Sequence, residues 1–180
     1  MPDIIERQDQ QNCVVHAINN ALQRVLVSPQ DAIDNIKRRF AMIERARSTR
    51  KRAMKRPMGI TMDRFIAQET RGGLRFDDLI PTLGEHGVRV HMFSLEPSTF
   101  DTRQLLVGRW VVIGRYPHFG HAIALCDGHV IESISEREPW PYHLLDRESP
   151  WPAQFVPRVL IRLDETATPP TVVESTTGRG

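Results

Sequence analysis

Residues 6–23 read ERQDQQNCVVHAINNALQ, and this stretch predicts a buried helix that begins at a cysteine. Asn12 is of a residue type that favours the N-cap position. Apolar side chains then recur at helical spacing, at Val14, Ile18, Ala21, Leu22 and Val25. We therefore expect a helix from Cys13 to about Leu26 with one face in the core.

Cys13 is a candidate nucleophile because it falls in the first turn of this helix. A thiol there faces the positive end of the helix dipole, which favours thiolate and lowers the pKa. Gln8 lies five residues earlier, and its side-chain amide is a candidate donor for an oxyanion hole. The alternative is a small cysteine that only packs at the start of a core helix, which is the usual situation for free cysteines.

The composition is that of a globular domain, with 40% apolar and 26% charged residues. No signal peptide and no apolar run long enough to cross a membrane is evident. Two cysteines are too few for a disulfide framework or a Cys-rich zinc site. We expect an intracellular protein, cytoplasmic or nuclear, that is a monomer and has no cofactor or metal.

The charge is unevenly distributed, although the net charge is only +2. Residues 37–56 contain ten basic residues and a single acid, Glu44, so this segment carries +9 and the remainder −7. Such asymmetry indicates an acidic or anionic partner. The alternative is a solvated helical arm whose charge only keeps it out of the core.

Further helices are expected in the first half of the chain. Ser28, Pro29 and Asp31 indicate a helix start, and the helix would bury Ala32, Ile33, Ile36, Phe40 and Ile43. Residues 48–58 then read as an exposed arm or loop. Thr61 is expected to cap a helix over 62–68. Another helix is expected over 77–86, where Pro81 is a local conflict.

The second half of the chain predicts strands. Residues 88–93 alternate in polarity, and short apolar segments follow at 110–115, 121–126, 129–133 and 156–163. A short helix is expected over 102–106. Helices followed by a mainly antiparallel sheet define an α+β fold. We expect one domain over 1–163 and a disordered tail over 164–180.

A cysteine nucleophile needs a nearby base and a group that orients that base. His121 begins the strand that precedes Asp127-Gly128, a two-residue hairpin signal. Paired residue numbers in this hairpin sum to 255, so 121 faces 134 and 123 faces 132. Glu132 then lies on the same face as His121, one diagonal away. The pattern predicts a site built from Cys13, His121 and Glu132.

Other interpretations of these residues remain open. His121 is alternatively a histidine at the sheet edge, and Glu132 a solvated acid at a strand end. His16 is a rival base on the helix of Cys13, but no residue is evident that would orient it. His118 is less constrained, and Cys126 alternates to the face opposite His121. No histidine pair has the spacing of a helical metal site.

The opening motif resembles that of the Josephin domain, the papain-like fold of the ataxin and josephin deubiquitinases. The motif is Gln8-x4-Cys13-x2-His16-x2-Asn19-Asn20-x-Leu22-Gln23. The likeness continues through Ser28-Pro29 and resumes over residues 73–93. It covers most of residues 3–163.

This resemblance implies a papain-like fold with a protruding helical arm over residues 37–58. It also implies hydrolysis of the bond after the C-terminal glycine of ubiquitin or a ubiquitin-like protein. Cys13 would be the nucleophile and His121 the base, with Gln8 in the oxyanion hole. The family usually has Asn as the third residue, whereas the shorter hairpin here offers Glu132, Ser133 or Asp127.

Two alternative functions are open. One is a viral or pathogen papain-like protease that cuts its own polyprotein. The other is a catalytically inert binding module that uses the basic arm to bind nucleic acid or another acidic surface, in a salt-sensitive manner. Both alternatives make predictions that differ from those for a deubiquitinase.

Overall fold

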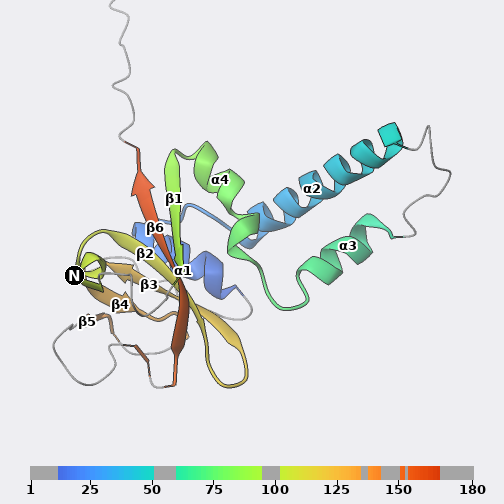
Figure 1. Cartoon of the computed structure of the whole chain (residues 1–180). Coiled ribbons are helices and arrows are strands. Elements are labelled where there is room, and N and C mark those ends of the chain that lie inside the picture. Colours follow the sequence, from blue (N-terminus) through green and yellow to red (C-terminus); the bar gives the residue numbers. More distant parts are fainter. Residues whose placement is uncertain are drawn as a thin grey trace, which may run out of the picture.

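The computed structural model describes residues 12–50, 60–94, 102–134, 138–142, 151–152 and 154–166. Gln8, residues 51–58 of the expected arm and residues 167–180 of the expected tail lie outside this part. Within it, helices and an antiparallel sheet form an α+β fold, as expected (Figure 1). No helix of the described part is long and apolar enough to cross a membrane.

The elements follow the expected order. The helices are α1 (Cys13–Leu22), α2 (Pro29–Arg50), α3 (Met62–Glu69) and α4 (Ile80–Glu85), with the 3-10 helices η1 (Phe76–Asp78) and η2 (Thr102–Leu106). The strands are β1 (Val88–Ser94), β2 (Arg109–Arg115), β3 (Gly120–Cys126), β4 (His129–Ile131), β5 (Trp140–Pro141) and β6 (Val156–Glu165). In the described part, these strands form one sheet in the order β1-β6-β2-β3-β4-β5.

Helix α1 begins at Cys13 as predicted but ends at Leu22, four residues early. The side chain of Asn19 turns to the following loop, where its oxygen accepts from the N–H groups of Leu26 and Val27. Gln23 takes the left-handed conformation that closes the helix. Asn12 occupies the N-cap position, although its side chain makes no capping hydrogen bond.

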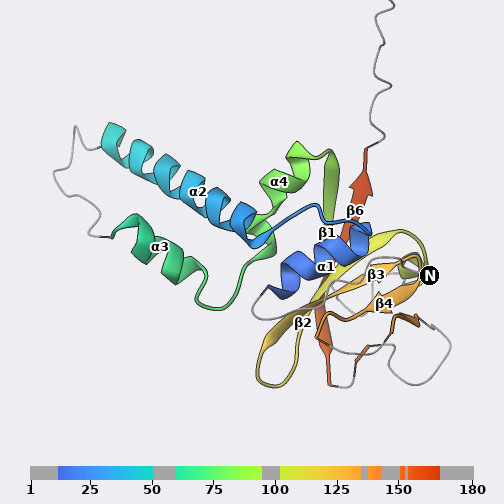
Figure 2. The ribbon, with the colours of Figure 1, turned by 180° about the vertical axis from the view of Figure 1, so that it is seen from behind.

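Helix α2 is longer than expected and projects from the sheet together with α3 (Figures 1 and 2). It starts with the predicted cap, in which Asp31 accepts from the backbone and hydroxyl of Ser28. The helix continues to Arg50, so residues 48–50 are helical and not a loop. Phe40 packs on Phe65 of α3 with ring centroids 5.1 Å apart.

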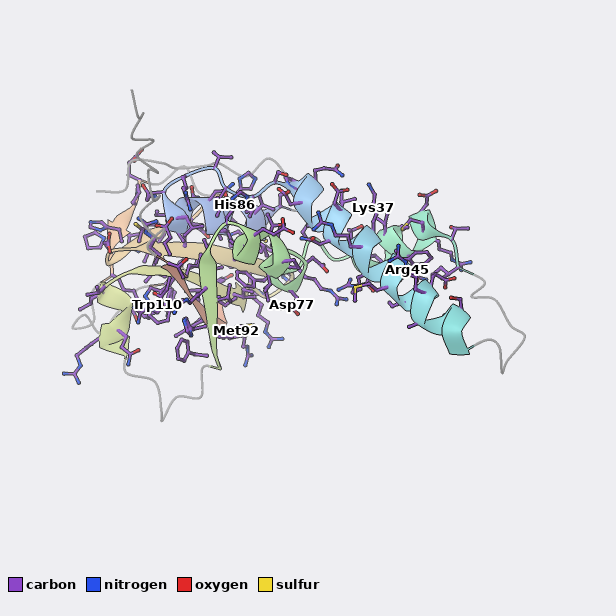
Figure 3. All side chains as sticks on the ribbon, turned by 90° about the horizontal axis from the view of Figure 1, so that it is seen from above. Lys37, Arg45, Asp77, His86, Met92 and Trp110 are labelled. Atoms are coloured by element: carbon purple, nitrogen blue, oxygen red, sulfur yellow. The ribbon has the colours of Figure 1, made fainter. Side chains whose placement is uncertain are left out.

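The basic residues of α2 are partly neutralised by acids of the same molecule. Lys37 pairs with Asp34, and Arg38 pairs with Glu85 of α4. Figure 3 shows Lys37 and Arg45 along the projecting helix, away from Trp110 in the sheet. In the described part, an ion pair within α2 and another between α2 and α4 therefore offset part of the positive charge at the start of the arm.

The segment after α3 enters the body of the fold through η1 and α4. The predicted cap Thr61 accepts from the N–H of Arg64 at the start of α3. The helix expected over 77–86 is divided, because α4 begins only at Ile80. Pro81 therefore lies in the first turn, where a missing N–H donor costs nothing.

The sheet has a hydrophobic core on each face, because successive side chains of a strand point to opposite faces and both sets are apolar here. One core joins α1 and α4 to the sheet and includes Ile18, Leu83, Val111 and Ile161. The other lies on the opposite face and includes Trp110, Ile123, Leu125 and Leu160. Strand β6 continues to Glu165, so the predicted boundary at 163 is two residues short.

The β3–β4 hairpin has the predicted register. Ala124 pairs with Ile131, and Cys126 pairs with His129, so paired numbers sum to 255. Asp127 and Gly128 both have positive φ, 45° and 75°, which is the geometry of a tight two-residue turn. Strand β4 ends at Ile131, two residues earlier than expected, and Glu132 follows directly.

Candidate active site

The N-terminus of α1 and the start of β3 meet at a pocket of about 830 Å³. Cys13 and His121 both line this pocket, although they are far apart in the sequence. The remaining walls come from residues 71–77, from β1, β2 and β6, and from the turn before β3. The structure therefore brings the expected nucleophile and the expected base to one concave surface.

Cys13 is partly buried at this pocket. Burial raises the pKa of its thiol, while hydrogen bonds from the backbone N–H groups of Ala122, Val14 and Cys13 itself oppose that shift. The expected lowering of the thiol pKa by the helix terminus is therefore outweighed by desolvation. The hydrogen bond from Ala122 places the sulfur beside the residue that follows His121.

His121 is almost completely buried, with 2% of its surface exposed. Burial lowers the pKa of this imidazole from its ordinary value to about 4. At neutral pH the ring is thus uncharged and able to accept a proton. Its Nε2 atom is buried and makes no hydrogen bond.

Glu132 lies next to that nitrogen, as the hairpin register predicted. Its Oε1 atom is 3.9 Å from Nε2 of His121, and the carboxylate is buried with 6% of the residue exposed. This distance exceeds that of a hydrogen bond. A thiol, an imidazole and a carboxylate are the three groups that a cysteine hydrolase uses.

Tyr116 was not identified from the sequence, yet it contacts both His121 and Glu132. Its hydroxyl donates a short hydrogen bond to Oε1 of Glu132. Its ring lies 5.9 Å from the His121 ring, 4.9 Å from Phe119 and 5.5 Å from Phe155. The only sequence signal was the pair of aromatic residues, 116 and 119, that brackets the β2–β3 turn.

Gly114 makes room for this aromatic cluster. It pairs with His121 across β2 and β3, beside an irregularity in the pairing of β2 with β6. A Cβ atom at this position would lie 2.5 Å from Cζ of Phe155 and 2.5 Å from the Val156 oxygen. Only glycine therefore lets Phe155 pack beside His121.

The pocket wall formed by residues 71–77 is held by a polar cluster at the base of α2. Arg39 forms ion pairs with Asp78, at 2.9 Å, and with Glu69 of α3, at 2.5 Å. The Asn35 amide donates to the backbone oxygen of Asp78 and to the hydroxyl of Thr82. Burial raises the pKa of Asp78, and Arg39 opposes that shift.

None of the other candidate residues in the described part lines the pocket. His16 on α1 and the exposed His118 do not line the pocket. Asp127 is exposed at the hairpin turn and accepts from the N–H of Gly108, so it is not the third residue of this site. Ser133 is buried after β4, and Cys126 packs in the core with α1.

No ligand set for a metal is found among the described residues, where no group of three or more His, Cys, Asp or Glu is arranged to hold one. Cys13, His121 and Glu132 are residue types that can serve as nucleophile, base and orienting group. No protein-family model matches the chain, and no curated protein sequence matches it.

Proposed function

We propose that this chain is a cysteine peptidase of papain-like, Josephin type that removes ubiquitin or a ubiquitin-like protein from its conjugates. The observation that carries the proposal is the shared pocket of Cys13 and His121, with Glu132 behind the imidazole. The substrate class comes from the resemblance of the opening motif and of residues 73–93 to the Josephin domain.

In the proposed reaction, the Cys13 sulfur attacks the carbonyl carbon of the terminal glycine. The thiol proton passes to Nδ1 of His121, whose imidazolium is stabilised by Glu132. The oxyanion accepts hydrogen bonds from the backbone N–H of Cys13 and from the Gln8 side chain. His121 then protonates the leaving lysine amine, and a water molecule that His121 activates hydrolyses the thioester.

The raised pKa of the Cys13 thiol and the lowered pKa of the His121 imidazole support a mechanism that starts from a neutral thiol and a neutral imidazole. Both groups are uncharged in the free protein at neutral pH, because burial disfavours each charged form. The proton therefore moves as the sulfur attacks, and His121 acts as a general base. The ion pair forms only along the reaction path.

The rim of the pocket supports a polypeptide substrate. Met92, Phe119 and Ile134 line the pocket and are 52%, 51% and 45% exposed. Large apolar side chains that remain in water around a concave site favour contact with a macromolecule. Among the arm residues in the described part, Lys37, Arg38 and Arg39 already pair with acids, which weighs against a module that only binds anions.

The test is reaction with a ubiquitin vinyl sulfone and cleavage of diubiquitin. We expect a covalent adduct on Cys13 that Cys13→Ala abolishes, while Cys126→Ala, at the other cysteine, retains it. Labelling that persists in Cys13→Ala contradicts the nucleophile assignment. Rapid alkylation of Cys13 by iodoacetamide with no ubiquitin adduct indicates a peptidase with another substrate, such as a polyprotein.

A further inference from the structure

We infer that Tyr116 is a positioning residue of the proposed active site and holds the Glu132 carboxylate toward His121. This inference rests on the proposed function, because it assigns a role within that site. The carrying observation is that one oxygen, Oε1 of Glu132, both accepts from the Tyr116 hydroxyl and lies 3.9 Å from Nε2 of His121.

Glu132 needs such a support because of where it stands in the fold. It follows the last residue of β4, Ile131, so the strand ladder ends just before it. Its side chain has several rotatable bonds, and a buried carboxylate must be held by hydrogen bonds to keep one orientation. Tyr116 lies in the turn that joins β2 to β3, so its hydroxyl reaches Glu132 from the other side of β3.

The Tyr116 ring is itself well fixed. The ring contacts Phe119 and Phe155, and the backbone N–H of Tyr116 donates to the Phe119 oxygen at 2.9 Å. Burial and the Glu132 carboxylate raise the pKa of the Tyr116 hydroxyl above its ordinary value. The hydroxyl therefore remains a donor across the whole pH range in which the protein works.

This geometry predicts how the carboxylate acts during the reaction. When His121 becomes charged, Nε2 and Oε1 need to approach by only about 1 Å to form a charge-assisted hydrogen bond. The hydrogen bond from Tyr116 keeps Oε1 of Glu132 directed toward Nε2 of His121. Since Tyr116 does not line the pocket, its hydroxyl acts on the chemical step and not on substrate binding.

The test compares Tyr116→Phe with Tyr142→Phe, which changes the other tyrosine of the chain. Phe keeps the ring and removes only the hydroxyl. For Tyr116→Phe we expect kcat to fall about tenfold on a fluorogenic ubiquitin C-terminal amide, with KM within about twofold. Tyr142→Phe should match the wild-type protein, and melting temperatures check that each variant is folded.

A double-mutant cycle separates positioning from packing. If Tyr116 acts through Glu132, then Tyr116→Phe has no further effect in a Glu132→Ala background. The rate of Cys13 alkylation by iodoacetamide, followed by mass spectrometry, provides a second readout that needs no substrate. Equal losses from Tyr116→Phe in both backgrounds, a change in KM alone, or wild-type rates would each overturn the role of Tyr116.

Failure of the proposed function gives a different result. In that case the wild-type protein does not turn over the ubiquitin amide, and Glu132→Ala leaves Cys13 alkylation unchanged. The positioning role of Tyr116 is then rejected together with the proposed function. A wild-type protein that is active and is matched by Tyr116→Phe overturns only the inference on Tyr116.

Discussion

Nε2 of His121 and Oε1 of Glu132 lie 3.9 Å apart across the β3–β4 hairpin, and both groups are buried. The separation is short enough for a strong charge interaction once the imidazole is protonated, because burial of both groups lowers the effective dielectric constant around them. In the resting state the imidazole is neutral and the interaction is weak. The pair is thus arranged to stabilise a charge that appears only during the reaction.

Removing the carboxylate of Glu132 should therefore slow the reaction without weakening substrate binding. We expect Glu132→Ala to lower kcat roughly 100-fold. Glu132→Gln should lower it about tenfold, because the amide oxygen still accepts from Nε2 but carries no charge. Steady-state kinetics on the ubiquitin amide measure both. Glu138→Gln, at an exposed acid beyond the hairpin, is the matched control, and an equal loss there would contradict the assignment.

The stability of the protein should depend on pH through His121. Burial holds the pKa of His121 at about 4, whereas the unfolded chain has the ordinary value of about 6.5. Between these values the unfolded state binds the proton and the folded state does not. The free energy of unfolding should therefore fall as the pH drops from about 6.5 to 4, by up to about 3 kcal/mol.

Urea denaturation of the wild-type protein and His121→Gln at pH 7, 5.5 and 4.5 measures this effect. As the pH falls, the free energy of unfolding should decrease more for the wild-type protein than for His121→Gln. If this difference stays constant between pH 7 and 4.5, the buried imidazole of His121 is not the source of the pH dependence of stability.

Arg39 should contribute much more to stability than its neighbour Lys37. Arg39→Ala leaves the Asp78 carboxylate without its cation, and the Asp78 side chain is only 2% exposed. We expect a loss of about 2–3 kcal/mol. Lys37 pairs with Asp34 at the surface, so Lys37→Ala should cost less than about 0.5 kcal/mol. Chemical denaturation compares the two variants, and equal costs would refute the role given to the Arg39–Asp78 ion pair.

Gly114 should tolerate no side chain. Gly114→Ala places a Cβ atom 2.5 Å from the Phe155 ring and the Val156 oxygen, so the ring and strand must shift. We expect a loss of about 2 kcal/mol, together with lower activity because Phe155 contacts His121. Gly84→Ala in α4 meets nothing within 4 Å and should be neutral or stabilising by about 0.5 kcal/mol. Thermal unfolding ranks the two variants, and the reverse order contradicts this account.

The hairpin of the candidate site could be predicted from sequence because it depends on local rules. Asp127 and Gly128 are residue types that accept positive φ, so they fix a two-residue turn and with it the register. A strand has a side-chain period of two, so the register alone decides which residue lies beside His121. The proximity of Glu132 and His121 followed from these facts.

The features that were not predicted depend on contacts between distant segments. Helix α1 ends early because Asn19 binds the loop at Val27, a contact that no helical pattern encodes. The thiol pKa rises because folding partly buries Cys13, so desolvation outweighs the helix terminus. Tyr116 lies in a turn without periodicity, and its bond to Glu132 depends on two hairpins meeting. Such contacts have no local signature in the sequence.

The tight turn at Asp127 and Gly128 has one more consequence, for how this site can change. A single residue inserted there would shift the pairing of β4 by one position and exchange the faces of Glu132 and Ser133. The imidazole would then have a hydroxyl for a neighbour in place of an acid, with every strand sequence intact. Loop length, more than point substitution, is thus the shortest route by which descendants of this chain could acquire a different catalytic partner.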